Sequence, residues 1–388
     1  MSKSSRQEYL QVTQIRYQQA NKKIKQQLLD EACRITSYHR TYVARVLRSN
    51  GKPKLSPTTT QTPRRRRCKY SKVTKRTVVK LWRAANSIAA ARLHPFIPDL
   101  LAKMLACGEI KTDEVSQEVV EQLEQISLAT VKRILSKASS INTVKLGGTT
   151  KPGSLLKRQI TIRYGRWNEQ TPGWCETDTV AHCGESLLGA FVYSLNVVDI
   201  CSGWSEQIAI LGKGSRAVTT GMESLRKRLP FKLLGLDMDN GSEFINYSML
   251  AYAKEHQIAL TRSRAYHKND NAHVEQKNWT AIRQLVGYSR YDTDRARNLL
   301  NSLYSYEWRL YLNFFQPTMK IKETKKDLVT GKKTRYYYQA KTPYQRLMEH
   351  PEISVEQKVM LKSVYDSLNP IELQRRIDQK LNLLAKEF

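Results

Sequence analysis

Three acidic residues stand in settings where a carboxylate can do chemistry rather than only solubilise a surface. Asp178 lies in the run WCETDTVAH, Asp239 follows the apolar run FKLLGLDM, and Glu275 lies in the segment AHVEQKNW. Carboxylate oxygens are the ligands that Mg²⁺ prefers. Two such ions about 3.5–4 Å apart can activate the attacking oxygen and stabilise the leaving oxygen of a phosphodiester. The three acids therefore predict a two-metal site, provided that the fold brings them together.

These acids are far apart in the sequence, so the elements that carry them must converge. From about residue 160 the pattern becomes strand-rich, with β-branched and aromatic runs that predict a three-stranded meander followed by alternating strands and helices. The expected strands cover residues 173–183, 188–200, 203–211, 231–239 and 258–262, and a long helix covers residues 272–287. We expect a mixed five-stranded sheet covered by helices, with reactive groups at the carboxyl ends of the strands and at the helix starts beside them.

Neighbouring acids compete for two of the three positions. Glu176 lies two residues before Asp178, and Asp237 lies two residues before Asp239. Residues two apart point to the same face of a strand, so strand geometry alone does not choose within either pair. Ordinary alternatives also exist: a surface ion pair for Asp178, and for Glu275 a first-turn acid favoured by the helix dipole.

Other polar residues near these acids have simpler explanations. We expect Glu243 to be structural, at the start of the helix after the turn, and Asp199 to close a turn. The pair Asn240-Gly241 favours a turn that fixes Asp239. The six cysteines are scattered without a Cys-x-x-Cys pair, which argues against a zinc knuckle and against a disulfide framework.

The segments around the three acids resemble a known superfamily. ETDTV, DNGSEFIN and KNDNAHVEQKNW resemble the three catalytic blocks of DDE transposases and retroviral-type integrases. Between Asp239 and Glu275 lie 35 residues, as in the integrase-like branch, and VEQKNWTAIRQLVGYSRY resembles bacterial insertion-sequence transposases. The resemblance covers about residues 172–310. The spacing and the adjoining Asn-Gly turn select Asp239 over Asp237.

The resemblance implies an RNase H-like catalytic core in which Asp178, Asp239 and Glu275 are catalytic and hold two Mg²⁺ ions, with Mn²⁺ as a substitute. The implied enzyme is a DDE transposase, a polynucleotidyl transferase that frees a 3′-hydroxyl at the ends of a mobile element and joins it directly to target DNA. The implied partners are double-stranded DNA with terminal inverted repeats, target DNA, and further copies of the chain assembled on DNA.

Two features depart from retroviral-type integrases. Trp279 stands one turn after Glu275, where those proteins commonly carry a lysine. The His/Cys zinc domain that precedes many integrase cores has no counterpart in this sequence. The residues that grip the transferred strand therefore stay open.

The charge balance points to a polyanionic partner. The 388 residues include 65 Lys and Arg against 35 Asp and Glu, a net charge of +30. Residues 1–100 alone hold 23 basic and 4 acidic side chains. Such one-sided charge favours nucleic acid, because each neutralised phosphate releases counterions. A basic surface kept only for solubility is the plainer alternative.

The chain is long for a single core, and its composition predicts several domains. Two helical regions are candidate DNA-binding units of the helix-turn-helix kind, with Ser37 and Ser127 as helix caps, although a plain basic helical hairpin is the alternative for the first. The expected order is a helix-turn-helix-like unit at 1–50, a basic linker at 51–70, a second helical DNA-binding unit at 71–138, a linker at 139–160, the catalytic core at 161–312, and a small basic C-terminal module at 313–388.

Candidate DNA contacts lie on the helical units, in the first linker and around the start of the catalytic helix. They are Arg40, Arg45, Arg48, Arg64, Arg65, Arg66, Arg67, Lys132, Arg133, Arg262, Arg264, Lys268, Asn271 and Lys277. The run of four arginines suits a phosphate backbone or a narrow minor groove, with a solvated charge run as the alternative.

The C-terminal module combines β-structure with a terminal helix. Basic and aromatic residues around Thr330-Gly331 predict a hairpin, with Tyr336 to Tyr338 as candidates for packing against a backbone. Leu373, Ile377 and further leucines at helical spacing predict a last helix that docks on the core or pairs with another subunit.

No long apolar stretch or signal core is present, so we expect a cytoplasmic, nucleoid-associated bacterial protein. The predicted function is a DNA transposase that performs metal-dependent 3′-end cleavage and strand transfer. Two alternatives stay open: a catalytically inert DNA-binding regulator that keeps the integrase fold, and an RNase H-type nuclease.

Overall fold

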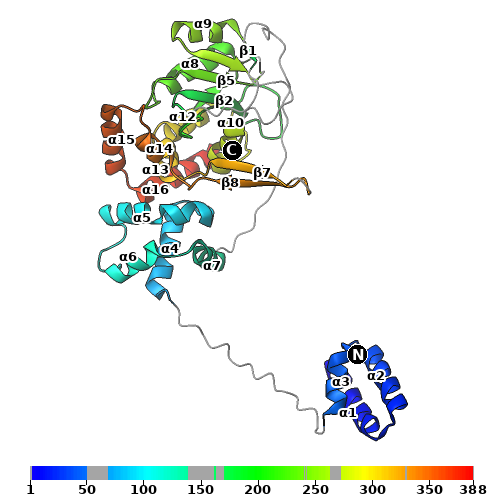
Figure 1. The fold of residues 1–388 in the computed structure, drawn as a ribbon. Helices are drawn as coiled ribbons and strands as arrows, with labels where there is room; N and C mark the ends of the chain where they lie inside the picture. The colour runs from blue at the N-terminus through cyan, green and yellow to red at the C-terminus, as the bar shows by residue number, and fades with distance from the viewer. Residues whose placement is uncertain are drawn as a thin grey trace. The chain divides into compact units, whose positions relative to one another are not determined.

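Two compact units make up the chain, Met1–Lys69 and Tyr70–Phe388 (Figure 1). The computed structural model describes residues 2–49, 69–138, 161–162, 170–239, 241, 243–262, 272–327 and 330–387. The expected linker at 139–160 and nearly all of the one at 51–70 lie outside the described residues. Within the described part of the chain, no helix has both the length and the apolar character needed to cross a membrane.

The first unit is a bundle of three helices, α1 (Lys3–Gln19), α2 (Lys22–Thr36) and α3 (Arg40–Arg48). Apolar side chains from all three form its core, among them Leu10, Leu28, Leu29, Val43 and Leu47. The expected helical character of this region is confirmed.

The expected cap at Ser37 is wrong. Ser37 has a positive φ of 56° and its N–H donates to the Cys33 carbonyl, so it ends α2 instead of starting α3. His39 precedes α3 and provides no side-chain cap. The left-handed conformation of Ser37 ends α2, and the N-cap position of α3 falls two residues later, at His39.

A six-stranded mixed sheet forms the centre of the second unit, in the order β1-β6-β5-β2-β3-β4. The five expected strands are confirmed within shorter bounds. They are β2 (Trp174–Ala181), β3 (Val192–Asp199), β4 (Ser205–Leu211), β5 (Gly235–Met238) and β6 (Ala259–Arg262). The sixth strand, β1 (Thr161–Ile162), pairs in parallel with β6. Two residues carry no readable periodicity, so this strand was not expected.

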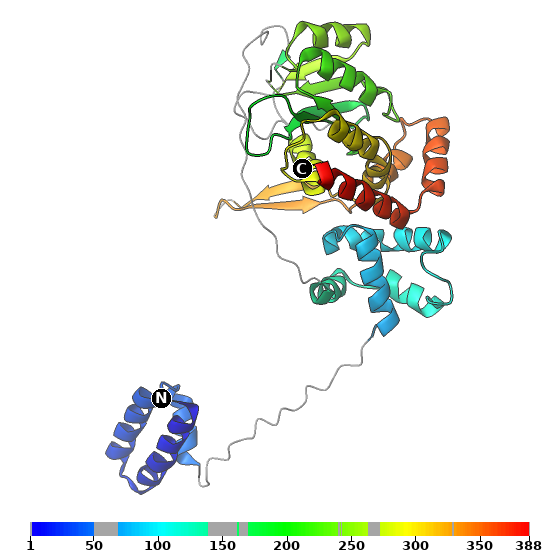
Figure 2. The same ribbon diagram turned by 180° about the vertical axis from the view of Figure 1, so that it is seen from behind.

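Helices cover both faces of this sheet (Figures 1 and 2). α8 (Ser215–Arg226) packs on β3 and β4 and also contacts α9 (Tyr247–Glu255). The expected long helix is a continuous helical segment made of α10 (Ala272–Lys277), η1 (Asn278–Arg283) and α11 (Gln284–Val286). Its middle part is a π-helix, a conformation that is rare and often found at functional sites.

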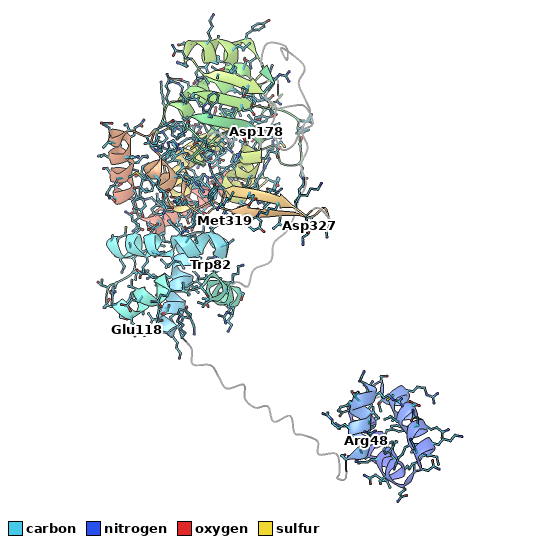
Figure 3. The ribbon with its side chains drawn as sticks, viewed as in Figure 1. Arg48, Trp82, Glu118, Asp178, Met319 and Asp327 are labelled. Atoms are coloured by element: carbon cyan, nitrogen blue, oxygen red, sulfur yellow. The ribbon has the colours of Figure 1, made fainter. Side chains whose placement is uncertain are left out.

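Four further helices form a bundle against the C-terminal part of the chain: α4 (Lys72–Ala84), α5 (Ala90–Ala106), α6 (Gln117–Glu124) and α7 (Leu128–Ala138). Trp82 and Glu118 mark this bundle in Figure 3. Ser127 caps α7 as expected, by accepting a hydrogen bond from the Thr130 N–H. Thr130 itself is buried, although the pattern predicts that it faces outward.

The bundle shares one hydrophobic core with the sheet and the C-terminal helices, so residues 71–138, 161–312 and 313–388 do not separate into independent cores. The Tyr311 hydroxyl donates to the Ala84 carbonyl (2.8 Å), and the Gln374 amide donates to the Arg83 carbonyl (2.9 Å). The helices on the C-terminal side are α12 (Asp294–Ser302), η2 (Leu303–Trp308), α13 (Arg309–Phe315), α14 (Pro343–Glu349), α15 (Val355–Ser367), α16 (Pro370–Leu384) and η3 (Ala385–Glu387).

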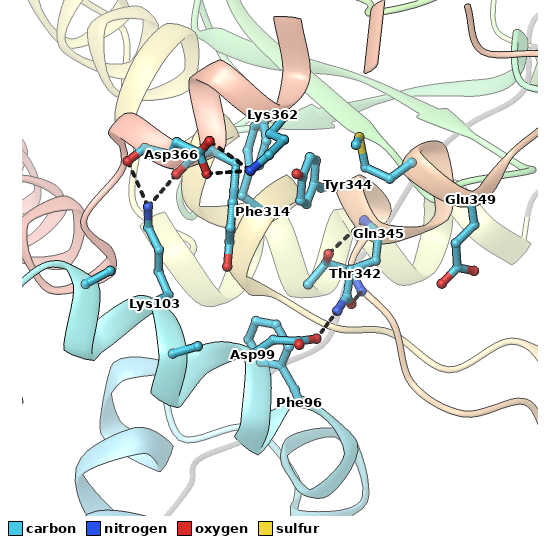
Figure 4. A pocket seen from close by; sticks show the side chains of 14 residues that line it. Phe96, Asp99, Lys103, Phe314, Thr342, Tyr344, Gln345, Glu349, Lys362 and Asp366 are labelled. Carbon is cyan, nitrogen blue, oxygen red and sulfur yellow. Dashed lines mark hydrogen bonds and ion pairs between the residues drawn. The ribbon is translucent and has the colours of Figure 1, made fainter. Parts of the chain in front are cut away.

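A pocket of about 720 Å³ lies between α5 and the C-terminal helices (Figure 4). Lys103 of α5 reaches across this contact, where its Nζ donates to the Tyr365 carbonyl (2.6 Å) and the Asp366 carbonyl (3.0 Å). Leu373 and Ile377 of α16 are buried in the same unit. The last helix therefore docks on the core of its own chain.

Candidate active site

Asp178 and Asp239 belong to neighbouring positions on the two central strands. β2 and β5 pair in parallel with Glu176 opposite Asp237. Two residues further along both strands, the same register places Asp178 next to Asp239, on the face shared by the first pair. Figure 3 marks Asp178 within the sheet. The structure therefore brings two of the three predicted catalytic residues together through strand register.

Helix α10 adds the third acid from above this face. α10 lies against β2 and β3, and Glu275 sits in its first turn with an exposed side chain. The charge of Glu275 is close enough to raise the pKa of Asp178. All three predicted acids thus belong to one electrostatic neighbourhood.

Burial and mutual repulsion make Asp178 hard to ionise. Burial is the largest cause that raises the pKa of Asp178, and the charge of Asp239 raises it further, to about 7. Burial also raises the pKa of Asp239, while the hydrogen bond from the Gly241 N–H opposes that rise. The charge of Asp239 therefore adds to the effect of burial on Asp178. A bound cation would therefore stabilise the ionised pair.

A chain of amides fixes the Asp178 carboxylate. Its Oδ1 accepts from the Thr179 N–H (2.7 Å) and its Oδ2 from the Asn278 Nδ2 (2.6 Å). Asn278 Oδ1 accepts from Asn196 Nδ2 (2.8 Å), and Asn196 Oδ1 accepts from Gln207 Nε2 (3.0 Å). The strand register sets Asn196 opposite Asp178 and Gln207 opposite Asn196. This network holds the carboxylate in one orientation.

Asn196 and Gln207 belong to no motif that predicts a site role, although the sequence carries a signal for them. Both side chains are fully buried in strands, where Asn is depleted. An Asn inside the apolar run VYSLNVVD must find a buried polar partner, because an unpaired buried amide is strongly unfavourable. That partner is the Asn278 amide, which in turn holds Asp178.

The rival acid Glu176 is engaged by the start of α10. Its Oε2 accepts from the backbone N–H groups of His273 (2.9 Å) and Val274 (2.8 Å), two donors that lack partners within the helix. Burial raises the pKa of Glu176 to about 8, although these backbone hydrogen bonds oppose the rise. Glu176 therefore ties β2 to the helix that carries Glu275.

Asp237 is likewise engaged within the sheet. It is buried, and its Oδ1 accepts from the Thr261 hydroxyl on β6 (2.5 Å). Glu176, Asp237 and Thr261 occupy one row across three strands. This row lies one step behind the row of Asp178 and Asp239.

A glycine in the turn after β5 leaves room for two carboxylates. The Gly241 N–H donates to Asp239 Oδ1 (2.9 Å). A Cβ at this position would lie 2.8 Å from Asp239 Oδ1 and 2.7 Å from the carboxyl carbon of Glu243. Glu243 faces Lys213 Nζ at 3.4 Å, which fits its expected structural role. Asn240, the other half of the expected turn, lies outside the described residues.

Asp199 closes a turn as expected. Its carboxylate accepts from the Gly173 N–H (2.8 Å), the Ser202 N–H (2.6 Å) and the Ser202 hydroxyl (2.5 Å). These bonds fix the loop between β3 and β4.

Several candidate DNA contacts are exposed. Arg45 and Arg48 lie on the surface of α3, and Lys132 and Arg133 lie on the surface of α7. Arg40 is exposed as well but forms an ion pair with Asp30.

Two candidates do not fit a surface role. Arg262 and Lys277 are each only 7% exposed. Burial lowers the pKa of Lys277 to about 7, with a smaller contribution from the neighbouring charge of Arg346. The expectation that these two side chains contact DNA needs correction, because Arg262 ends an interior strand and Lys277 lies on the packed face of its helix. The remaining candidates, Arg64, Arg65, Arg66, Arg67, Arg264, Lys268 and Asn271, lie outside the described residues.

The donor chemistry around Asp178 fits a hard divalent cation. Carboxylate oxygens dominate the site. Burial is the main cause that raises the pKa values of Asp178 and Asp239, and neighbouring negative charges raise them further, so a cation would favour the ionised forms. Among the residues that the structure describes, no three His, Cys, Asp or Glu side chains are already gathered closely enough to enclose a metal. Asp178 and Asp239 would hold the cation, and the exposed Glu275 would have to turn toward it.

The buried charge of Asp178 should make stability depend on pH. Folding raises the pKa of Asp178 from 3.8 to about 7 when no cation is bound, so the folded state binds this proton more tightly than the unfolded state. In the presence of a chelator, the resulting stabilisation is fully present only below about pH 4. Stability is lost as the pH rises from about 4 to about 7. Asp178→Asn should therefore exceed the wild type in unfolding free energy at pH 8, by on the order of 1–3 kcal/mol, and lose this advantage near pH 4.

Calorimetric unfolding at the two pH values measures this difference. Asp113→Asn, at an exposed site, is the control and should show no comparable difference. Mg²⁺ should stabilise the wild type more than the Asp178→Asn protein. A variant less stable than wild type by the same amount at both pH values would contradict the assigned repulsion.

Removing the Glu176 carboxylate should loosen the start of α10. Glu176→Leu deletes the acceptor for the His273 and Val274 N–H groups, so hydrogen exchange at these two amides should accelerate. Because Glu275 sits one turn along, affinity for Mg²⁺ should fall by about 10–100-fold. Glu176→Gln keeps a carbonyl oxygen at this place and should preserve most of both properties. Unchanged exchange in the Leu variant would contradict the proposed tie.

Comparisons with known proteins agree with this geometry. A family model described as the integrase core domain matches residues 168–268, a range that contains Asp178 and Asp239. The uncharacterized protein y4rM of Sinorhizobium fredii is 36% identical over 329 residues, which cover 83% of this chain and 90% of that protein.

Similar solved structures come from retroviruses. The catalytic core domain of BIV integrase is 17% identical with a TM-score of 0.28, covering 45% of this chain and 91% of that chain. An intasome of simian T-cell lymphotropic virus, in complex with PP2A regulatory subunit B56 gamma, is 16% identical with a TM-score of 0.28 and covers 51% of this chain and 60% of that chain. This chain belongs to one family with y4rM, and its residues 168–268 match an integrase core domain, a catalytic core of the DDE integrase and transposase type.

Proposed function

We propose that this protein is a DNA transposase that cleaves the 3′ ends of a mobile element and transfers them to target DNA. One observation carries the proposal: Asp178 and Asp239 directly follow the last paired residues of β2 and β5, Thr177 and Met238, and the charges of Asp239 and of Glu275 on α10 both act on Asp178. The family membership supports phosphodiester chemistry at this place. A regulator without catalysis has no use for a buried and mutually repelling pair of acids.

The residues around the site would position the acids rather than react. Asn278 donates to Asp178 and keeps one carboxylate oxygen oriented. Glu176 holds the start of α10, and the Gly241 N–H orients Asp239. Integrase cores are generally dependent on divalent metals, and two Mg²⁺ ions held by the three acids would activate the attacking oxygen and stabilise the leaving oxygen. The attack is direct, so no Ser or Tyr nucleophile is assigned.

The DNA would be held mainly by surfaces outside the acidic site. Arg45 and Arg48 on α3, and Lys132 and Arg133 on α7, are exposed and carry charge that suits phosphates. The net charge of +30 favours binding to any duplex, so sequence recognition has to come from the helical units. Joining two element ends would require more than one copy of the chain.

Neutralising any of the three acids should abolish catalysis while DNA binding persists. Asp178→Asn, Asp239→Asn and Glu275→Gln each remove a carboxylate that stabilises charge developing at the phosphate, so strand transfer should fall by roughly 10³-fold or more. The assay uses purified full-length protein, a duplex carrying the flanking repeat of its gene, a supercoiled target and Mg²⁺. EDTA should stop the wild-type reaction.

Asp237→Asn is the matched control, because it makes the same change two residues away in the row behind the site. It should lower activity far less than Asp239→Asn. The reverse result would mean that the wrong aspartate was chosen. Degradation without joined products would favour an RNase H-type nuclease, and binding without either reaction would favour an inert regulator.

A further inference from the structure

A two-stranded hairpin stands apart from the packed core of the second unit. β7 (Ile321–Lys326) and β8 (Lys333–Tyr337) pair only with each other, and every residue of both strands is exposed. Figure 1 shows the hairpin extending away from the helices, and Asp327 lies near its tip in Figure 3. A hairpin without a buried face is marginally stable by itself. Its exposed side chains are therefore available to contact another molecule.

One face of the hairpin concentrates positive charge. The strand register sets Lys326 directly opposite Lys333 and Thr324 opposite Arg335. Because alternate residues share a face, Lys326, Lys333 and Arg335 lie together, and none of the described residues on this face is acidic. Like charges directly opposite each other destabilise a strand pair. A polyanion bound to this face would attract all three cations and offset their mutual repulsion.

The other face carries exposed aromatic rings beside cations and one acid, Glu323, which lies opposite Tyr336 and 3.6 Å from Lys325 Nζ. Tyr336 is 48% exposed and Tyr338 is 56% exposed. Lys325 Nζ lies 5.6 Å from the centre of the Tyr336 ring, and Lys322 Nζ lies 5.9 Å from that of Tyr338. Amphipathic rings with an adjacent positive charge suit the sugar-phosphate surface of a nucleic acid.

The base of the hairpin is fixed to the catalytic sheet. Lys320 Nζ donates to the Ile200 carbonyl (2.7 Å), and the Tyr338 N–H donates to the Lys320 carbonyl (2.9 Å). Arg346 Nη2 donates to the Thr318 carbonyl (2.5 Å) on the incoming strand. Ile200 follows the end of β3 that pairs with the start of β2, so the hairpin joins the sheet at the end opposite Asp239.

We propose that the hairpin of residues 321–337 is a duplex-DNA-binding arm that grips the phosphate backbone through Lys326, Lys333 and Arg335. The arm is a contact site separate from the acidic centre, and it holds DNA without reading its sequence. Naming duplex DNA as the polyanion rests on the proposed function. The charge complementarity itself comes from the hairpin alone.

The salt dependence of DNA binding tests the arm directly. Full-length protein carrying Lys326→Gln, Lys333→Gln and Arg335→Gln is titrated onto blunt DNA duplexes of two unrelated sequences, in EDTA, over a range of salt concentrations. Each lost phosphate contact lowers the slope of log K against log salt by about 1, so the triple variant should lose about 3. The loss should be equal for both sequences. The melting temperature should be unchanged, because these side chains lie outside the core.

Two further variants separate the arm from general charge and from hairpin stability. Lys358→Gln, Arg375→Gln and Lys386→Gln remove the same charge from the C-terminal helices and should leave the slope nearly unchanged. Lys326→Glu places an acid opposite Lys333, so it should slow hydrogen exchange in the hairpin while it weakens DNA binding. Weaker binding from a better-ordered hairpin excludes a purely structural role.

Three results would contradict the proposed DNA-binding arm. An unchanged slope in the triple variant, an equal loss in the helix control, or a loss seen with single-stranded RNA and absent with duplex DNA would each do so. Asp178→Asn protein in the same assay should keep the full wild-type slope. The slope could fall in the triple variant while the wild-type protein joins no strands. That result would support the proposed arm and contradict the proposed transposase function. Strand transfer by the wild type, with an unchanged slope in the triple variant, would support the transposase function and contradict the arm.

Discussion

The repulsion between Asp178 and Asp239 is the constraint on which the rest of the catalytic sheet depends. The parallel register of β2 and β5 forces the two carboxylates together, and burial deprives them of water. Such a pair is unfavourable in a protein without a bound cation, so the surrounding structure must hold it in place. The strain is useful, because a site that repels itself binds a divalent cation strongly.

Two sets of hydrogen bonds keep this arrangement from relaxing. On one side, Asn278 joins Asp178 to the buried amide of Asn196. On the other, Glu176 accepts two N–H groups at the start of α10 and fixes the helix over the sheet. The first set orients Asp178, and the second positions the helix that carries Glu275. Asp178 and Glu275 thus each depend on a partner from a distant part of the chain, whereas Asp239 is held by the nearby Gly241 N–H.

The sequence predicted the five main strands, the catalytic helix and the neighbourhood of the three acids, because apolar periodicity and motif spacing are local signals. It could not reveal that Glu176 caps α10, since that contact joins residues 97 positions apart. The burial of Lys277 was also hidden, because a lysine in a basic segment reads as surface until the helix is packed. Ser37 was misread for a related reason: a serine suits either end of a helix, and only the backbone conformation decides.

Acidic and basic side chains occupy different parts of the molecule. Acids concentrate in the interior of the sheet, where they would bind cations, whereas the hairpin and α3 expose cations that suit phosphates. DNA brought to an acidic centre without help would be repelled, because both carry negative charge. Cations bound at the centre, and basic side chains elsewhere on the chain that hold the DNA, would each offset part of that repulsion. The Lys326–Lys333 pair, like the Asp178–Asp239 pair, is unfavourable in the free protein and becomes favourable only when the opposite charge arrives.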